Sequence, residues 1–524
     1  MSPTAQLICA ISAGTALLAG LVVTPIVRTL ARRVGFVDKP DGGRKAHQHA
    51  VALGGGLAVA ISTGCGFLAA AIASWAYGSQ LPGLMADFRL PMFLSVLLIL
   101  LLGLTDDAVA MRGRYKLLGQ VMIGGFIIAA GLTIDRFSLF GASYELGWFA
   151  YPFTLFWLLG SINAINLIDG IDGLAGSVGV ILCLTVASIF AFVVGRPTDV
   201  LILACLAGGL LGFLRYNFAP ASIYLGDAGS MMVGLVIGVL AISGNAKSTL
   251  ATGLMIPVAV WSIPILDSSA AILRRKLTGR SVFAADRGHL HHSLLSRGWS
   301  VRQASFFVAL ICAITCLSAV LSVVWKNEWI ALFTVIAVVL YLISTKTFGH
   351  IEYTLVRDQI TYNSLPATGE QRDSGGRERS ISLQGSHEWK ELWTSILEYA
   401  EGNDLNSVQL SINIPALNEV FFAKWSSTHR LAEEEAIWKL NFPFLAAGQS
   451  VGSIELSGAE TGSKKSALPQ LSESLDFLSL TEEEIDKIRK RITQERTGKL
   501  AERPNESDSN QGPEATIASP SVSS

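Results

Sequence analysis

Long apolar runs alternate with short polar connections over the first two thirds of the 524-residue chain. A helix that crosses a bilayer needs about 20 apolar residues, and fewer when one end is buried in protein. The pattern therefore predicts an all-α polytopic membrane domain over residues 1–345, with about eleven transmembrane helices. They fall near 6–28, 51–77, 91–105, 117–134, 148–163, 174–194, 199–215, 229–243, 251–272, 303–325 and 329–345. No basic residue precedes the first run, so we interpret it as a retained span and not as a signal peptide.

The pattern changes after residue 345. Residues 346–387 are expected to form a linker, because their second half is polar and rich in glycine and serine. Residues 388–460 combine an amphipathic helical stretch with three alternating stretches, which predicts a small soluble α+β domain. For residues 461–524 we expect a charged helix at 481–492 followed by a disordered tail. This C-terminal extension contains no catalytic motif, and the sequence assigns it neither a function nor a partner.

Basic residues are concentrated on one side of the predicted membrane. One alternate set of connections holds seventeen Lys and Arg residues, and the other set holds five. Cytoplasmic loops collect Lys and Arg, so the first set is expected in the cytoplasm and the N-terminus outside. With eleven spans, the C-terminal extension is then cytoplasmic as well.

Composition supports a membrane protein and argues against a nucleic-acid-binding extension, a disulfide framework and a zinc site. The chain is 51% hydrophobic and 15% charged. Residues 1–345 contain 22 Lys and Arg against 14 Asp and Glu, whereas the remainder contains 18 against 27. An acidic extension argues against nucleic-acid binding. All six cysteines lie in apolar runs, which is typical of buried hydrophobic residues and not of a disulfide framework or a zinc site.

The most polar stretch within the apolar part is NAINLIDGIDGLAGS, residues 163–177. It places Asp169 and Asp172 between two apolar runs, three residues apart, so they share a face if the segment is helical. Ionisable groups at membrane depth are costly and usually functional. The alternative is a plain loop built from cap and turn residues.

Three further polar clusters occur along the chain. LTDDAVAMRGRYKLLGQ contains the adjacent acids Asp106 and Asp107 and then Lys116. NFAPASIYLGDAGSMMVG places Asp227 at the start of a new span, where a helix N-terminus also attracts phosphate. DRGHLHHSLLSRG groups basic side chains that suit a diphosphate better than zinc, namely Arg287, His289, His291 and His292. Helix-capping acids and a lipid-contacting basic loop are the simpler alternatives.

All four clusters lie on the predicted cytoplasmic face, which indicates one site built from several loops. Asn166 and Asp227 offer the oxygen ligands that Mg²⁺ prefers. Acids, a lysine and an anion-binding His/Arg group beside a membrane point to phosphoryl transfer in which one substrate is a lipid.

The four motifs together resemble the polyprenyl-phosphate N-acetylhexosamine-1-phosphate transferases, glycosyltransferase family 4, over about residues 1–345. The resemblance implies transfer of a sugar 1-phosphate from a UDP-N-acetylhexosamine to undecaprenyl phosphate, with release of UMP. It implies a multi-pass protein of the bacterial inner membrane, embedded among membrane lipids, with its active site facing the cytoplasm. The expected metal is Mg²⁺, with Mn²⁺ as an alternative, and a homodimer stays open.

The resemblance also implies roles for individual residues. Asp106, Asp107 and Lys116 would position and activate the lipid phosphate, and Asn166 and Asp227 would hold the metal. Substrate would be bound by residues of three loops: Asp169 and Asp172 at the nucleotide, Arg287, His289, His291 and His292 at the diphosphate or sugar, and Lys45 and His47 in the first loop. The first loop departs from the family pattern, because Ala52 and Leu53 stand where the family often has Pro-Arg.

The DRGHLHH form resembles the branch that uses UDP-GlcNAc or a related simple sugar for cell-envelope polysaccharides such as O-antigen. Transfer from UDP-MurNAc-pentapeptide in peptidoglycan synthesis is the nearer alternative. An ion-coupled transporter is the alternative from a different class, although the acids lie at span ends and not at the midplane. An inactive scaffold serving the C-terminal extension is a third interpretation.

Overall fold

The computed structural model describes most of the chain, in segments separated by gaps. The described residues are 1–38, 50–77, 89–139, 142–247, 261–277, 290–349, 353, 376–384, 388–403, 405–414, 419–427, 437–446, 449–459 and 467–501. The chain divides into two compact units, Met1–Ser364 and Leu365–Ser524.

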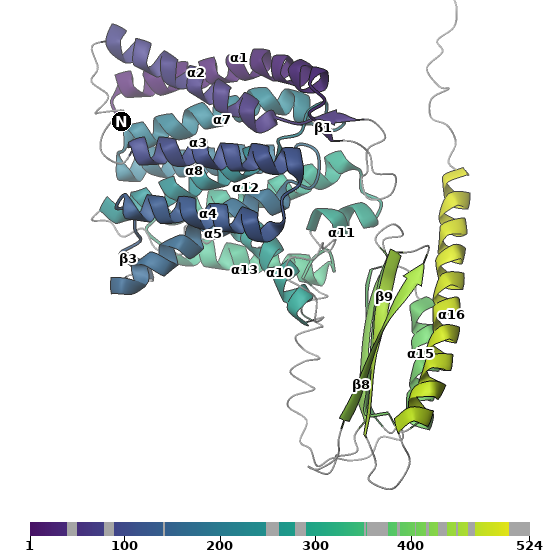
Figure 1. Ribbon diagram of the computed structural model, residues 1–524. Coiled ribbons are helices and arrows are strands. Elements are labelled where there is room, and N and C mark those ends of the chain that lie inside the picture. Colours follow the sequence, from purple (N-terminus) through teal and green to yellow (C-terminus); the bar gives the residue numbers. More distant parts are fainter. Residues whose placement is uncertain are drawn as a thin grey trace, which may run out of the picture. The chain divides into compact units, whose positions relative to one another are not determined.

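The first unit is a bundle of helices (Figure 1). In chain order they are α1 (Pro3–Arg33), α2 (Gly55–Ala76), α3 (Arg89–Val109), α4 (Gly113–Ala129), α5 (Ala150–Ile168), α6 (Leu174–Ile189), α7 (Pro197–Asn217), α8 (Gly226–Lys247), α10 (Ser262–Leu277), α11 (Leu290–Ser296), α12 (Val301–Val324) and α13 (Trp329–Ser344). Two short antiparallel pairs join them, β1 (Val37–Asp38) with β2 (Val51–Ala52) and β3 (Arg136–Leu139) with β4 (Ala142–Glu145). A 3-10 turn η1 (Gly147–Phe149) precedes α5, and a π-helical turn η2 (Phe190–Val194) follows α6.

Seven helices of the described chain are long and apolar enough to cross a membrane: α1, α2, α3, α5, α6, α7 and α12. Two more, α8 and α13, are apolar but shorter. All seven coincide with runs that the sequence predicts as spans. The larger count of eleven, and the position of the N-terminus, stay predictions.

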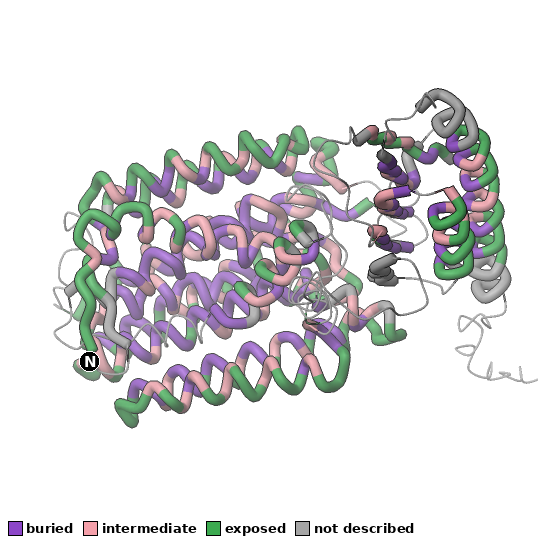
Figure 2. The backbone as a smooth tube through the Cα atoms, turned by 90° about the horizontal axis from the view of Figure 1, so that it is seen from below, coloured by how far each residue is buried: buried purple, intermediate pink, exposed green. Residues whose placement is uncertain are grey.

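The outward faces of the helices carry large apolar side chains, as a membrane protein requires. Along α1, Leu18, Val22, Ile26 and Leu30 recur every four residues and are each more than half exposed. Figure 2 shows the same alternation of exposed outer and buried inner faces along the helices of this unit. A soluble protein rarely exposes apolar surface of this extent, so the first unit is a multi-pass membrane domain.

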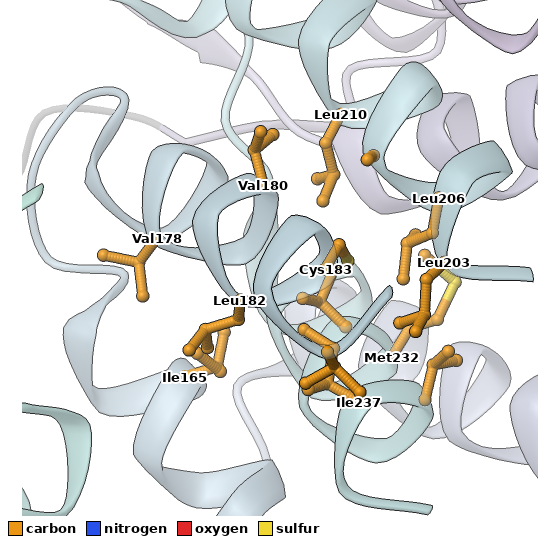
Figure 3. Packing of buried hydrophobic residues seen from close by; sticks show 14 of the residues in the cluster. Ile165, Val178, Val180, Leu182, Cys183, Leu203, Leu206, Leu210, Met232 and Ile237 are labelled. Carbon is orange, nitrogen blue, oxygen red and sulfur yellow. The ribbon is translucent and has the colours of Figure 1, made fainter. Parts of the chain in front are cut away.

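Close approach of helices through small residues organises the bundle interior. A Cβ added to Gly208 of α7 would lie 2.3 Å from the Ala13 carbonyl oxygen of α1. Glycines at such crossings let backbones pack directly, which is how membrane helices associate. Figure 3 shows part of the buried apolar cluster, in which Ile165, Cys183, Leu206 and Met232 come from α5, α6, α7 and α8. These four helices therefore form the centre of the unit.

The second unit is an antiparallel sheet with two helices on one face (Figure 1). The strand order is β5-β7-β6-β9-β8, and all neighbours are antiparallel. The bounds are β5 (Gly376–Gln384), α15 (Glu388–Gly402), β6 (Ser407–Ile414), β7 (Glu419–Ser427), β8 (Ile437–Ala446), β9 (Gln449–Ala459) and α16 (Ala467–Ala501). Trp393 and Ile396 of α15 and Ile488 of α16 belong to one buried cluster with the sheet.

This second unit differs in extent from the sequence expectation. Strand β5 lies within residues 346–387, which the sequence assigns to a linker. Helix α16 begins 14 residues before the expected start at Thr481 and runs to Ala501. Its apolar residues pack into the same core, so the α+β unit includes residues beyond 460.

Candidate active site

Four segments that are distant in the sequence meet at one end of the helix bundle. Helices α3 and α5 end there, and helices α4 and α8 begin there, because successive helices alternate in direction. Asp106 comes from α3, Lys116 from α4, Asn166 from α5 and Asp227 from α8. The bundle topology thus gathers the polar ends of four apolar helices.

The Lys116 ammonium group connects the four helices. Its Nζ lies 2.9 Å from Asp106 Oδ2 and 2.5 Å from Asp227 Oδ2. It also donates to Asn166 Oδ1 at 2.9 Å. The side chains of Lys116 and Asp106 are only 14% and 8% exposed, so these charges are little screened by water. The cation offsets the repulsion between the two acids that contact it.

Asn166 holds the same acid from a second direction. Its Nδ2 donates to Asp227 Oδ1 at 2.6 Å and to Ser230 Oγ at 3.0 Å. Both carboxylate oxygens of Asp227 are therefore engaged, one by Lys116 and one by Asn166. This fixes the orientation of the Asp227 carboxylate at the first turn of α8.

Asp107 has a different role from its neighbour Asp106. Its two carboxylate oxygens accept hydrogen bonds from the backbone N–H groups of Asp227 at 2.8 Å and Ala228 at 3.2 Å. Asp107 thus caps the N-terminus of α8, where a negative charge is stabilised. Gly226 has φ +74°, and an added Cβ there would lie 2.6 Å from Asp107 Oδ2. Only glycine fits this contact.

Asp169 lies where α5 stops, and not on a helix. Helix α5 ends at Ile168, and α6 starts at Leu174 after Gly173, whose φ is +76°. Asp169 and Asp172 therefore do not share a helical face. Burial, and then the charges of Asp227 and Asp107, raise the pKa of Asp169 to about 8. The Asp169 carboxyl group is therefore harder to ionise than an ordinary aspartate.

Asp172 supports the loop between α7 and α8. Its Oδ2 accepts a hydrogen bond from the backbone N–H of Ala221 at 2.8 Å. Buried Asn217 links the same two loops, because it accepts from the Gly173 N–H at 3.1 Å and donates to the Ile223 carbonyl at 3.0 Å. The loop then continues beside α2, where the Gly55 N–H donates to the Tyr224 carbonyl at 3.0 Å.

The site also uses residues that sequence reasoning did not select. Besides Ser230 and Asn217, a third is Gln120, one helical turn after Lys116 on α4 and fully buried. Gln120 accepts from Asn163 Nδ2 at 2.7 Å and ties α4 to α5. A polar side chain four residues from the lysine, within an apolar run, is the signal that identifies it.

Several predicted substrate-binding residues lie outside the described residues. These are Lys45, His47, Arg287 and His289. His291 and His292 lie in the short helix α11, but only their backbone is described. The assignments of all six stay predictions.

The donor atoms of the cluster suit a hard cation. Carboxylate oxygens of Asp106 and Asp227 and the amide oxygen of Asn166 already converge on one positive group, the Lys116 ammonium. Within the described part of the chain, no three His, Cys, Asp or Glu side chains form a preformed metal cage. A Mg²⁺ ion needs no such cage, because it takes one or two carboxylates and completes its shell with water and substrate phosphate.

The part of the chain that resembles known proteins includes the residues of this cluster. The sequence model of the family described as glycosyl transferase family 4 matches residues 90–245. A probable undecaprenyl-phosphate N-acetylglucosaminyl 1-phosphate transferase of Bacillus subtilis is 34% identical over 62% of this chain and 88% of its own length. A decaprenyl-phosphate N-acetylglucosaminephosphotransferase of Mycolicibacterium smegmatis is 31% identical over 63% of this chain and 86% of its own. The chain belongs to glycosyl transferase family 4.

Membership of glycosyl transferase family 4 confirms the resemblance drawn from the four motifs. A phospho-N-acetylmuramoyl-pentapeptide-transferase of Moorella thermoacetica is also similar, at 33% identity over 42% of this chain and 73% of its own length. The family match contains Asp106, Lys116, Asn166 and Asp227, the four residues of the connected cluster. It ends before the second unit begins.

Proposed function

We propose that this family 4 protein transfers N-acetylglucosamine 1-phosphate from UDP-GlcNAc to undecaprenyl phosphate and releases UMP. The observation that supports this most is the Lys116 cluster, in which buried charges are collected at the end of an apolar bundle. A lipid substrate anchored in the membrane would present its phosphate at this level. The names of the Bacillus subtilis and Mycolicibacterium smegmatis relatives support the same donor sugar and a polyprenyl acceptor.

The reaction we propose is a direct displacement at phosphorus. An oxygen of the lipid phosphate attacks the phosphorus that bears the sugar, and the bond between the two phosphates of the donor breaks. The bridging oxygen leaves with UMP, and the sugar phosphate becomes part of a lipid diphosphate. The lipid phosphate is already an ionised nucleophile, so no covalent enzyme intermediate is required.

Each candidate residue has a role in this scheme. Lys116 exchanges its contact with Asp227 for the lipid phosphate, and Asp106 keeps the ammonium group oriented. Asp107 fixes the start of α8 through its two backbone hydrogen bonds. Substrate recognition is assigned to Asp169 and Asp172 at the nucleotide, and to Lys45, His47, Arg287, His289, His291 and His292 at phosphate or sugar.

A divalent cation belongs to the same proposal. Asn166 and Asp227 would hold Mg²⁺, or Mn²⁺, through the oxygens that now contact Lys116. The bound ion would neutralise the diphosphate of the donor as negative charge shifts to the leaving UMP. The hydrogen bonds that Asn166 Nδ2 donates to Asp227 Oδ1 and to Ser230 Oγ keep these oxygens oriented before substrate arrives.

We further propose that eleven helices cross the bacterial inner membrane, with the N-terminus outside and the site facing the cytoplasm. The excess of basic residues in the connections at the end of the bundle that carries the site supports this orientation. UDP-sugars would then reach the site from the cytoplasm, and the lipid product would remain in the membrane.

Transfer from UDP-MurNAc-pentapeptide is the second candidate, supported by the similarity to the Moorella thermoacetica protein. That match covers less of this chain than the Bacillus subtilis match does. Membership of a transferase family favours both candidates over the ion-coupled transporter and the inactive scaffold.

A donor panel tests the proposal. Purified full-length protein in detergent receives undecaprenyl phosphate and Mg²⁺ with UDP-GlcNAc, UDP-GalNAc or UDP-MurNAc-pentapeptide, each with and without EDTA. We expect mass spectrometry to identify a lipid diphosphate carrying GlcNAc, formed only without EDTA. Product from the pentapeptide donor alone would establish the second candidate, and no product from any donor in folded protein would contradict the transferase proposal.

A further inference from the structure

A cavity lies at the same end of the bundle as the Lys116 cluster, and Lys116 is not among the residues that line it. It has a volume of about 500 Å³ and is lined by Arg28, Arg215 and Arg302, by Tyr216, and by Phe218, Ala219, Pro220 and Ser222 of the α7–α8 loop. We call it the arginine cavity. Its three basic residues come from α1, α7 and α12, so helix packing collects them from distant parts of the chain.

Two of the three guanidinium groups are held in place by the loop. Arg28 Nη1 donates to Ser222 Oγ at 3.0 Å, and the Arg28 guanidinium lies over the Tyr216 ring, 5.6 Å from its centroid. Arg302 Nε donates to the Ala219 carbonyl oxygen at 2.7 Å. Each of these side chains thereby loses conformational freedom before any ligand binds, which reduces the entropic cost of binding.

The positive charge in the cavity is not neutralised by the described protein. None of the three arginines forms an ion pair with a carboxylate of the described chain. A guanidinium group has five N–H donors, and Arg28 and Arg302 each use one in the bonds above. The remaining donors form planar pairs that match phosphate oxygens.

A general preference for basic residues on one membrane face does not explain this convergence. That preference requires only that basic residues lie on the face, as Arg33 does. Arg33 ends α1, is exposed and does not line the cavity. Three like charges around one cavity repel each other unless an anion lies between them. The geometry points to a phosphate-binding site in the arginine cavity, separate from the proposed transfer site and independent of the proposed reaction.

The ligand is a phosphate group, and it has two sources at this level. One is the headgroup of an anionic phospholipid, since the cavity lies at the ends of helices that cross the membrane. The other is a soluble phosphate, such as a nucleotide. The Ala221 backbone, held from the other side by Asp172, belongs to the loop that lines the cavity, so a bound phosphate would also brace that loop.

Arg215 gives the cleanest test, because it is exposed and makes no hydrogen bond to the described chain that its loss would break. Full-length wild type, Arg215→Gln, Arg302→Lys and the matched control Arg33→Gln are purified in detergent. Native mass spectrometry measures binding of phosphatidylglycerol against phosphatidylcholine, and calorimetry measures binding of inorganic phosphate and UMP. Arg302→Lys retains the charge but loses the planar pair of donors.

We expect about tenfold weaker binding in Arg215→Gln and Arg302→Lys than in wild type, with Arg33→Gln unchanged. A loss confined to phosphatidylglycerol identifies a lipid headgroup, and a loss confined to inorganic phosphate or UMP identifies a soluble ligand. Equal binding by wild type and both cavity variants in every arm would overturn the proposal. An equal loss in Arg33→Gln would do the same, because it would indicate general surface charge only.

Discussion

Asp106 and Asp107 are adjacent in sequence but act on different partners. Sequence reasoning treated them as one catalytic pair with Lys116. In the structure Asp106 contacts Lys116, whereas Asp107 caps α8. Successive residues of a helix point about 100° apart, so two neighbouring acids at a helix end reach different neighbouring helices. The residue types were predictable, but the division of roles depends on which helix lies beside each face.

Substitution of Asp107 separates its capping role from the role of its charge. Asparagine has one accepting oxygen where the carboxylate has two, so Asp107→Asn should keep one of the two backbone hydrogen bonds and lower the melting temperature less than Asp107→Ala, which should destabilise by about 1 kcal/mol or more. We expect both variants to lose at least about tenfold in transferase activity, because the charge beside Asp227 is gone. Wild-type activity in Asp107→Asn would show that Asp107 is a structural cap only.

The polar residues that the sequence did not reveal support the ones that it did. Gln120 and Ser230 lie in two of the motifs quoted from the sequence, each beside an apolar run, and they contact Asn163 and Asn166. A polar residue one helical turn from Lys116 marks Gln120 as a candidate in the sequence, and the three-dimensional contacts then show which side chain it supports. Asn217 and Tyr224 lie in the same motif as Ser230, and the hydrogen bonds of Asn217 to Ile223 and of the Tyr224 carbonyl to Gly55 show their structural roles.

At the scale of elements, the site depends on how closely α3 approaches α8. A Cβ added to Gly103 of α3 would lie 2.3 Å from Ala228 Cα of α8. One turn further along α3, Asp107 meets the α8 N-terminus. The glycine therefore sets the distance over which the cap forms. Hydrophobic periodicity predicted both helices but not this crossing, because it does not specify which helices are neighbours.

A methyl group at Gly103 should force the two helices apart. We expect Gly103→Ala to destabilise the protein by about 1–3 kcal/mol, as overpacking does, and to reduce transferase activity. The matched control is Gly125→Ala in α4, where an added Cβ meets nothing within 4 Å. Thermal unfolding in detergent checks both. Equal stability of the Gly103 variant and wild type would contradict the close packing described for α3 and α8.

The second unit shows which strands an alternation of apolar and polar residues can predict and which it cannot. The stretches at 408–414, 436–445 and 451–456 alternate, and they correspond to β6, β8 and β9. Strand β7 is missed because its sequence, EVFFAKWSS, has adjacent apolar residues. Strand β5 is missed because its sequence is mainly charged and polar. Both take their place from pairing with neighbours, which the local pattern does not encode.

At the scale of the whole molecule, the two units have separate apolar cores, and the family match covers only the first unit. The apolar cluster of the first unit and that of the second share no residue. The family match and the Lys116 cluster lie entirely in the first unit. Sugar-phosphate transfer therefore belongs to the membrane unit, and no chemistry is assigned to the C-terminal sheet.

The central claim is that transfer takes place at the Lys116 cluster, and UMP release tests it most directly. Full-length wild type, Lys116→Gln and the control Lys326→Gln are compared with UDP-GlcNAc, in the presence and absence of undecaprenyl phosphate. Lys326 is exposed and follows the C-terminal end of α12. Helix α12 begins at the end of the bundle where the site lies, so Lys326 is at the opposite end. Both substitutions remove one positive charge from a side chain of similar length.

We expect lipid-dependent UMP release from wild type and Lys326→Gln at the same rate. In Lys116→Gln the rate should fall by at least roughly 100-fold, the scale of loss that follows removal of one preorganised group that stabilises transition-state charge. UMP release by Lys116→Gln at the wild-type rate would contradict the account, since the residue that joins Asp106, Asn166 and Asp227 would then have no part in the reaction.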